Sequence, residues 1–293
     1  MTMSLNNNKK IIIGTAQFIA NYGIKNRKIK ITKNKATTIL KYCEKNKINI
    51  LDTSDVYPCF KKFLPSYNLK NWKISLKISD DLFVKLFKKK RFTYFCNKIL
   101  SKFKKKKIDY LFFHNTKSLL CKDGKNIYLE VQDLKKKGVI KKIGVSVYNL
   151  KEINNIIKNF RIDVIQIPFN VFDQRIKSER ILKKLKSLKI EIHARSIFLQ
   201  GLLLMKEKQL PKKFLMFDKH FKKWFQFYKK NKLSPLNECL NFAFNNTFID
   251  KYVIGVDSIE NLKEIINCKI KKNKRNYNNL KSENKFLIDP RTW

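Results

Sequence analysis

The segment Ile48-Asn-Ile-Leu-Asp-Thr-Ser-Asp-Val-Tyr57 decides the fold prediction. It joins a short apolar run to an acid, Asp52, and a tyrosine, Tyr57, follows five residues after that acid. A short apolar run of this kind is typical of a buried parallel strand. We therefore predict a strand over residues 48–54, with Asp52 toward its carboxyl end and Tyr57 in the loop beyond. In a β/α barrel, the carboxyl ends of the strands form the face that carries the chemistry.

Strand-like and helix-like segments alternate along the rest of the chain. Further strands are predicted at residues 10–16, 72–78, 108–114, 142–148, 164–170, 190–197 and 251–256. Helices are predicted at residues 32–46, 80–105, 127–137, 150–159, 178–188, 234–245 and 258–267. This alternation predicts an α/β fold in which eight parallel strands close into a (β/α)8 TIM barrel with outer helices.

A doubly wound sheet is the alternative fold for such a pattern. It would usually carry a glycine-rich fingerprint after the first strand, but Gly14 stands alone here and the next glycine is Gly23. No low-complexity linker divides the chain. We predict one domain over residues 1–293, with a tail from about residue 273, and a loop with at most a short helix over residues 56–70.

Composition limits the classes of protein to which the chain can belong. Hydrophobic residues make up 43% of the sequence, which is not the composition of a disordered chain. No apolar run approaches the roughly 18 residues that a membrane-spanning helix needs. Residues 1–10 are polar and rich in asparagine, without the apolar core of a signal peptide. A cytoplasmic location and no membrane partner are expected.

The net charge of +43 could indicate a nucleic-acid partner. Only eight of the 66 basic residues are arginine, whereas recognition of bases and phosphates favours the arginine fork. The lysines are spread along the whole chain, and lysine, asparagine and isoleucine are enriched together, as an AT-rich coding sequence would produce. We expect solvated lysine surfaces and no nucleic-acid binding, with a basic nucleic-acid-binding protein as the third-ranked alternative.

The six cysteines are scattered and contain no C-x-x-C pair, so neither a zinc site nor a disulfide framework is predicted. Buried free thiols are expected, and no metal site is predicted.

The three histidines differ in context. His193 alternates with apolar neighbours and is expected to be packed, His220 lies in a lysine-rich segment and is expected to be exposed, and His114 ends a very apolar strand, where a functional group would stand.

Polar side chains recur at the ends of the predicted strands, and in a barrel these ends converge on one mouth. They are Asp52 with Tyr57 beyond it, Lys77, His114, Ser146, Gln166 with Asn170, and Ser196.

The chemistry of the first four is specific. A tyrosine, with an ordinary pKa near 10, is a proton donor at neutral pH, and we expect a close lysine to lower that pKa. A carboxylate would hold the lysine charged, and a histidine could orient a substrate carbonyl. Such a group suits proton donation to an oxygen that becomes an alkoxide. Carbonyl reduction also needs a hydride, which no side chain supplies, so a nicotinamide cofactor is predicted.

Several ordered motifs resemble the aldo-keto reductases over about residues 10–267. They are GTAQF at 14–18, the D-T-x-x-x-Y spacing from Asp52 to Tyr57, SLKIS around Lys77, IDYLFFHN at 108–115, GVIKKIGVSVY at 138–148, VIQIPFNVFDQR at 164–175, HARSIFLQGLL at 193–203 and YVIGVDSIENLKEI at 252–265. The resemblance implies a (β/α)8 barrel that binds NADPH or NADH without a Rossmann domain and reduces a small carbonyl substrate.

The resemblance also implies roles for individual residues. Tyr57 would be the general acid, tuned by Lys77 and Asp52, and His114 would orient the carbonyl. The implied cofactor positions are Ser146, Gln166 and Asn170 at the nicotinamide carboxamide, Ser196, Phe198 and Gly201 near the pyrophosphate, Gly255, Asp257 and Asn261 at the adenosine phosphate end, and Gly14, Thr15 and Arg195 in the same site.

The sequence departs from the family pattern at a few places. Pro58 replaces the usual glycine after the tyrosine, and the Ser-Glu pair that follows it is missing. Val147 stands where many members have an asparagine, and Asn261 where NADPH-preferring members often have an arginine. Arg195 stands where many members stack an aromatic ring on the nicotinamide. These changes keep a second hypothesis open, a nicotinamide-binding barrel with little turnover that acts as a sensor or partner subunit.

Substrate specificity in this barrel would come from loops, here residues 58–70 and 202–233. The second loop is rich in aromatic residues, and these could line a pocket or pack a helix against the barrel, with packing favoured. They are Phe214, Phe217, Phe221, Trp224, Phe225 and Phe227.

Overall fold

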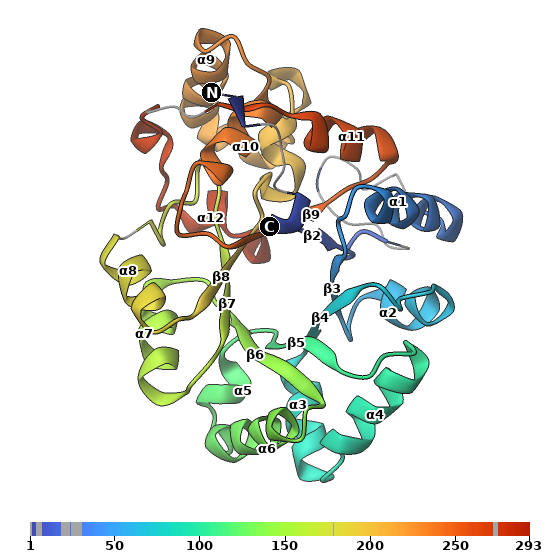
Figure 1. The fold of residues 1–293 in the computed structure, drawn as a ribbon. Helices are drawn as coiled ribbons and strands as arrows, with labels where there is room; N and C mark the ends of the chain where they lie inside the picture. Colours follow the sequence, from blue (N-terminus) through green and yellow to red (C-terminus); the bar gives the residue numbers. More distant parts are fainter. Residues whose placement is uncertain (1, 4–7, 19–23, 25–30, 178, 272–274) are drawn as a thin grey trace.

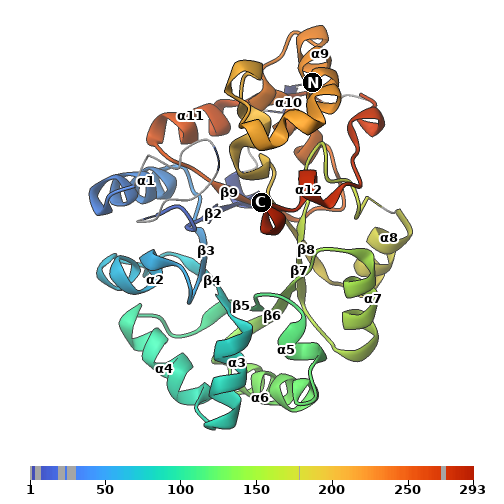
Figure 2. The ribbon, with the colours of Figure 1, turned by 180° about the vertical axis from the view of Figure 1, so that it is seen from behind.

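The computed structural model describes residues 2–3, 8–18, 24, 31–177, 179–271 and 275–293. Within these residues, eight parallel strands close into a barrel, which confirms the predicted fold. Figures 1 and 2 show the strands as a central ring with helices outside it. In order around the ring they are β2 (Ile11–Gly14), β3 (Ile50–Ser54), β4 (Lys73–Ile78), β5 (Ile108–Phe113), β6 (Ile140–Ser146), β7 (Val164–Pro168), β8 (Glu191–Arg195) and β9 (Lys251–Gly255).

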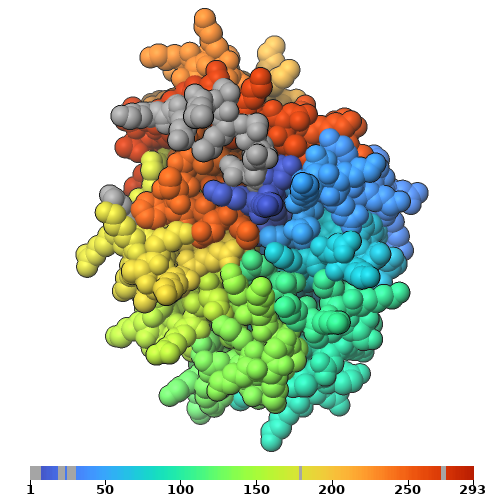
Figure 3. All heavy atoms as spheres, in the orientation of Figure 1, coloured from blue at the N-terminus to red at the C-terminus, as the bar shows by residue number. Residues whose placement is uncertain are grey.

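The barrel closes between its first and last strands. Ile13 of β2 pairs with Leu51 of β3 on one side and with Ile254 of β9 on the other. Figure 3 shows the same closure from outside, where the dark blue start of the chain lies against an orange stretch near its end. A separate antiparallel pair joins β1 (Thr2–Met3) to β10 (Ile270–Lys271).

Helices cover the outside of the barrel. The α-helices are α1 (Lys33–Lys45), α2 (Pro58–Lys62), α3 (Asp80–Lys88), α4 (Phe92–Lys102), α5 (Lys117–Leu120), α6 (Gly124–Lys136), α7 (Leu150–Asn159), α8 (Glu179–Ser187), α9 (Asp218–Lys230), α10 (Pro235–Phe244), α11 (Ile259–Asn267) and α12 (Lys285–Ile288). The 3-10 turns are η1 (Asn8–Lys10), η2 (Leu64–Ser66), η3 (Leu199–Leu204), η4 (Glu207–Gln209), η5 (Lys212–Phe217), η6 (Asn278–Leu280) and η7 (Pro290–Thr292).

Several helices start where the sequence signals a cap. The Ser234 side chain accepts a hydrogen bond from the Asn237 N–H at the start of α10, and Pro235 occupies the first turn. Ser258 caps α11 in the same way. At the other end of a helix, Gly138 follows α6 with φ +74°, the left-handed conformation that a C-terminal glycine adopts readily. The predicted start of a helix at Ser178 lies outside the described residues.

The prediction of one helix over residues 80–105 was wrong. The chain forms α3 and α4 instead, with a break between them at Lys90, whose φ is +51°. The Lys90 N–H donates to Phe87 O and the Arg91 N–H donates to Leu86 O, which closes α3 before α4 begins. Non-glycine residues rarely adopt this conformation, so a run of lysines carried no sequence signal for the break.

The tail from about residue 273 is largely built into the fold, although residues 273 and 274 lie outside the described part. The Tyr277 hydroxyl donates to Glu238 Oε2 of α10 at 2.8 Å, and the Ser282 N–H donates to Phe172 O at 2.9 Å. The ring of Trp293 lies 5.0 Å from that of Phe214. The last segment of the chain is therefore fixed beside the barrel mouth.

Two of the histidines lie away from the mouth. His193 is fully buried, as predicted, and its Nε2 lies 2.9 Å from Glu191 Oε1. The prediction that His220 is exposed was wrong, because it is half-buried. Its Nε2 donates to Leu280 O at 2.8 Å, and its ring packs edge-on against Phe172.

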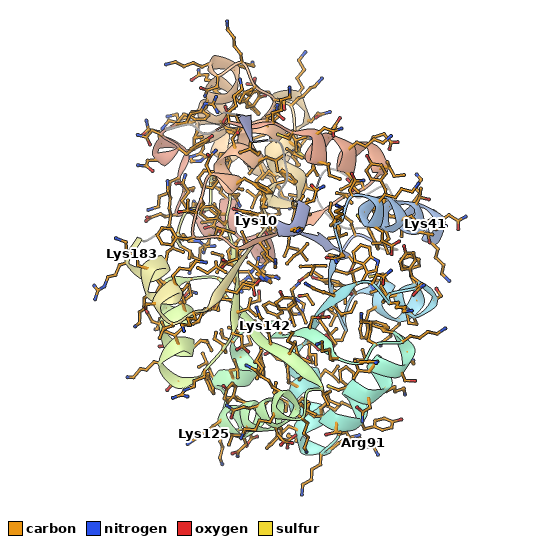
Figure 4. All side chains as sticks on the ribbon, in the orientation of Figure 1. Lys10, Lys41, Arg91, Lys125, Lys142 and Lys183 are labelled. Atoms are coloured by element: carbon orange, nitrogen blue, oxygen red, sulfur yellow. The ribbon has the colours of Figure 1, made fainter. Side chains whose placement is uncertain are left out.

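The basic side chains are distributed around the molecule. In Figure 4, Lys41, Arg91, Lys125 and Lys183 point away from the barrel on four different sides. Lys142 differs, since it pairs with Glu191 inside the ring. The +43 charge is therefore not collected on one helix or one edge.

Two further sequence expectations concern thiols and membranes. Of the six cysteines, five are buried as expected, and Cys121 is exposed. No helix in the described parts of the chain combines the length and the apolar character needed to cross a membrane.

Gly144 is required by the packing inside the barrel. A Cβ added there would lie 2.5 Å from Phe112 Cε1 and 2.7 Å from Val164 Cγ1, and both of these side chains are fully buried. We expect Gly144→Ala to lower the free energy of unfolding by about 1–3 kcal/mol, the usual effect of overpacking. Urea denaturation of the variant measures this change.

Lys125→Ala, on the exposed face of α6, is the matched control and should alter the free energy of unfolding by less than about 0.5 kcal/mol. Equal stability of Gly144→Ala and the wild type would contradict the packing described for Phe112 and Val164.

Candidate active site

A buried ion pair lies at the base of the barrel mouth. Asp52 on β3 and Lys77 on β4 are 2% and 4% exposed, and Lys77 Nζ pairs with Asp52 Oδ1. The second oxygen, Oδ2, accepts hydrogen bonds from Ser75 Oγ at 3.2 Å and Gln166 Nε2 at 3.0 Å. The carboxylate is therefore held by side chains from two other strands, β4 and β7, and it in turn fixes the ammonium group.

Tyr57 stands directly above this pair. It occupies the position just before α2, without a side-chain capping hydrogen bond, and Lys77 Nζ lies 5.8 Å from the centroid of its ring. Pro58 occupies the first turn of α2, where the fixed φ of proline suits a helix start. The departure from the family pattern at Pro58 thus starts a short helix immediately after the tyrosine.

The Tyr57 phenol has a pKa well above its ordinary value. Burial is the main cause, and the negative charge of Asp52 is the next. The expectation that Lys77 would lower this pKa was therefore wrong for the net effect, because desolvation of the phenolate exceeds the attraction of nearby cations. The phenol remains protonated at neutral pH and is available as a proton donor.

His114 follows β5 and completes the group. Its ring lies edge-on to that of Tyr57, with centroids 6.2 Å apart. Burial, followed by the charge of Lys77, lowers its pKa from 6.5 to about 4. The imidazole is therefore neutral at pH 7, and it adds no positive charge to the site.

Ser54 determines which nitrogen of His114 carries the hydrogen. Ser54 Oγ lies 3.2 Å from His114 Nδ1 and 3.1 Å from Asp55 Oδ1, and its one hydrogen can serve only one of them. When Ser54 donates to Nδ1, Nε2 carries the hydrogen and can donate to a carbonyl oxygen. When Ser54 donates to Asp55, Nδ1–H donates to Ser54 and Nε2 is an acceptor.

A cavity of about 1310 Å³ opens above these residues. It brings together most of the site residues that the sequence predicted. Those lining it are Gly14, Asp52, Tyr57, Lys77, His114, Ser146, Gln166, Arg195, Ser196, Phe198, Gly201, Gly255, Asp257 and Asn261.

Thr15 and Asn170 do not line this cavity. Thr15 is fully buried, and its hydroxyl donates to the backbone carbonyl of Asp52 at 2.9 Å. Asn170 Nδ2 donates to Ser196 O at 3.0 Å, and its Oδ1 accepts from the Phe172 and Asp173 N–H groups. Each side chain therefore binds the backbone of a residue that lines the cavity, Asp52 for Thr15 and Ser196 for Asn170.

Comparison with protein families agrees with the geometry of this mouth. The model of the aldo/keto reductase family matches residues 10–284, nearly the whole chain. The chain belongs to the aldo/keto reductase family. Membership implies carbonyl reduction with a nicotinamide cofactor and a small carbonyl substrate. No significant match was found among curated proteins.

Solved structures of other aldo-keto reductases share the fold at low sequence identity. The holo form of an aldo-keto reductase from Bacillus halodurans has a TM-score of 0.66 at 15% identity, covering 88% of this chain and 85% of that one. A glycerol dehydrogenase from Gluconobacter oxydans has a TM-score of 0.66 at 15% sequence identity, and the match covers 88% of this chain and 86% of that one. A thermostable aldo-keto reductase in complex with the inhibitor epalrestat has a TM-score of 0.64 at 14% sequence identity, and the match covers 92% of each chain.

The residues around the cavity of this aldo-keto reductase fit a nicotinamide dinucleotide. Gln166 Oε1 is buried and has no hydrogen-bond partner among the described residues, so it can accept from a carboxamide. The backbone is left-handed at Ser196, Gln200 and Gly201, which turns the loop after β8 along the cavity wall. The N-terminus of α11, capped by Ser258, also faces the cavity and favours an anion.

Charged residues line the same cavity toward α1 and α11. They include the cations Lys35, Lys269 and Lys271, which suit phosphate groups. Asp257 also lies there and accepts a hydrogen bond from Gln17 Nε2 at 2.5 Å. Because the family resemblance stops near residue 267, it gave no reason to select Lys269 or Lys271.

Sequence reasoning also missed two residues at the mouth. Tyr148 follows β6, and the guanidinium groups of Arg195 and Arg291 lie over its ring at 4.2 Å and 3.3 Å from the centroid. Tyr148 could have been found from its place directly after a strand end. Arg291 could not, because the tail has no repeating pattern to place it.

The aromatic loop after β8 packs and does not line the cavity. Phe214, Phe221, Trp224 and Phe225 are buried, and Trp224 Nε1 donates to Leu203 O at 3.1 Å. This confirms the favoured interpretation, in which the aromatic residues hold α9 against the barrel.

The neutral state of His114 gives a testable prediction. Because the pKa is lower in the folded chain than the 6.5 of an ordinary histidine, the unfolded state binds more protons between about pH 4 and 6.5. The stability that this group contributes is therefore lost as the pH falls through that window. An imidazole NMR titration should give a pKa near 4 for the resonance that disappears in His114→Gln, and a value near 6.5 would contradict the burial described here.

Proposed function

We propose that this aldo-keto reductase reduces an aldehyde or ketone with hydride from NADPH or NADH, and that Tyr57 is the general acid. The observation that carries the proposal is a protonated phenol at the cavity wall, on a half-buried tyrosine, with a buried ammonium group beneath it. A proton donor of this kind suits a carbonyl oxygen, since that oxygen gains negative charge as a hydride reaches its carbon.

The nicotinamide, when bound, supplies the hydride to the carbonyl carbon. Tyr57 gives its hydroxyl proton to the carbonyl oxygen, so that an alcohol forms and the phenol becomes a phenolate. Lys77 then lies beside the new negative charge, in surroundings where charge interactions are stronger than in water. Asp52 keeps Lys77 in place, and neutral His114 contacts the oxygen without a competing charge.

Among the cofactor positions, Gln166 and Ser146 are proposed to hold the carboxamide, and Ser196, Phe198 and Gly201 to lie near the pyrophosphate. Gly255, Asp257 and Asn261 are proposed for the adenosine end. Asp257 is a carboxylate and Asn261 carries no charge, so these two residues give no support for a strict requirement for a 2′-phosphate.

Replacement of Tyr57 tests the proton donor. We expect Tyr57→Phe to lower kcat for aldehyde reduction by about 100- to 10,000-fold, the range typical of general acid catalysis. Binding of NADPH, measured by the change in its fluorescence, should be retained. The exposed Tyr94 on α4 provides a control, because Tyr94→Phe removes a hydroxyl far from the cavity.

Unchanged turnover in Tyr57→Phe would contradict the mechanism. If the wild type binds NADPH but reduces no aldehyde or ketone of a broad panel, the alternative of a nicotinamide-binding sensor or partner subunit gains support.

Replacement of Lys77 separates catalysis from stability. Lys77→Met leaves the buried Asp52 charge unpaired, so it should lower the free energy of unfolding by about 3–5 kcal/mol as well as kcat. Adding Asp52→Asn removes the unpaired charge. The double variant should regain much of the stability, measured by urea denaturation, and should stay slow in aldehyde reduction. Recovery of activity together with stability would contradict a role for Lys77 in the chemical step.

A further inference from the structure

Arg195 lines the reaction cavity at the end of β8. Its positive charge partly opposes the rise in the pKa of Tyr57 and adds to the fall in the pKa of His114, so the guanidinium lies close enough to affect the reacting groups. Its contacts are few. Nη1 lies 3.5 Å from Ser196 Oγ, and the guanidinium carbon lies 4.2 Å from the centroid of the Tyr148 ring.

No carboxylate pairs with Arg195 among the described residues, and its Nη2 is buried without a hydrogen-bond partner. The contrast with two other arginines is direct. Arg175 Nε and Nη2 both donate to Asp173, at 2.8 Å each, and Arg291 donates to both oxygens of Asp289. A buried N–H group without an acceptor is costly, and an incoming acceptor would remove that cost.

The presence of arginine rather than lysine at position 195 also points to binding of an oxyanion. In a chain whose cations are nearly all lysines, arginine at these positions forms a planar fork that binds both oxygens of a carboxylate. Arg195 offers the same planar pair of N–H donors, but no carboxylate of the described residues binds to it. The guanidinium of Arg195 lies over the Tyr148 ring, and Arg291 brings a second guanidinium to the same ring.

The surroundings would attract an anion. The cations lining the cavity outnumber its carboxylates, with Lys35, Lys77, Arg195, Lys269, Lys271 and Arg291 against Asp52, Asp257 and Glu264. Lys77 is paired with Asp52 and Arg291 with Asp289, whereas Arg195 has no carboxylate partner among the described residues and its charge acts on the phenol of Tyr57. The lysines visible on all sides in Figure 4 add a positive field that favours the approach of anions.

We infer that the substrate is a carbonyl compound bearing an oxyanion, a carboxylate or a phosphate, which Arg195 binds while the carbonyl faces Tyr57. This rests on the proposed function. The reaction is unchanged by it: the carbonyl carbon gains a hydride from the reduced nicotinamide, the oxygen gains the Tyr57 proton, and the oxyanion takes no part in bond making. Arg195 serves as a specificity-determining residue.

The test compares kcat/KM for matched pairs of aldehydes. Succinic semialdehyde against butanal examines the carboxylate, and glyceraldehyde 3-phosphate against glyceraldehyde examines the phosphate. We expect the wild type to prefer the anionic member of at least one pair by more than about 10-fold, and Arg195→Met to reduce that preference by about 10-fold or more, as loss of a hydrogen bond to a charged group would. Arg195→Lys keeps the charge but loses the fork and should fall between the two.

Lys125→Met is the matched control, since it removes one positive charge from an exposed site on α6 and should leave both preferences unchanged. Raised salt should weaken the preference of the wild type only partly, because a cation inside a cavity is screened less than a surface one. Urea denaturation of each variant shows whether it is folded.

Four results would overturn the inference. Equal kcat/KM for both members of each pair would show that no oxyanion is recognised, while leaving the proposed reduction intact. An anionic preference that survives in folded Arg195→Met would assign recognition to another residue. Weaker NADPH binding in Arg195→Met, with both members of each pair slowed equally, would assign Arg195 to the cofactor. If no aldehyde or ketone is reduced at all, the proposed function fails and the inference fails with it.

Discussion

The ion pair between Lys77 and Asp52 is the interaction on which the site depends. Two charges buried at the base of a barrel are tolerable only when each is paired and hydrogen-bonded, and breaking such a pair usually costs about 3–5 kcal/mol. Ser75 of β4 and Gln166 of β7 complete the shell around the carboxylate, so two other strands, one next to β3 and one across the barrel, hold this group. The ammonium group of Lys77 is therefore placed correctly only when the strands of the barrel have come together.

The same burial sets the protonation states of the groups above the pair. It raises the pKa of Tyr57 and lowers that of His114, so one group stays a neutral acid and the other a neutral imidazole. Asp52 and Lys77 carry the charges of the site, and Arg195 adds a third from the cavity wall. A site with a neutral donor above a fixed cation matches a reaction in which negative charge appears on oxygen only during the chemical step.

The sequence predicted the barrel and the residues at its strand ends because both follow from local patterns. Short apolar runs marked the strands, and Asp52, Lys77 and His114 had to meet once the strands were parallel and closed. The break at Lys90 could not be predicted, because a lysine in the left-handed region leaves no mark in the sequence. The place of Arg291 in the site could not be predicted for a different reason, since its contact with Tyr148 joins segments that only the folded chain brings together. The pKa of Tyr57 was predicted in the wrong direction because burial outweighs a neighbouring charge that the sequence alone suggests.

In the proposed mechanism the phenol of Tyr57 gives its proton to the carbonyl oxygen as the hydride arrives. Single-turnover oxidation of NADPH by an aldehyde, followed by absorbance in ordinary and heavy water and with deuterium at the transferred position, tests it most directly. If Tyr57 donates its proton as the hydride arrives, each deuterium substitution slows the chemical step, and both together slow it further. A rate that responds to the deuterated cofactor and is the same in both waters would contradict the claim.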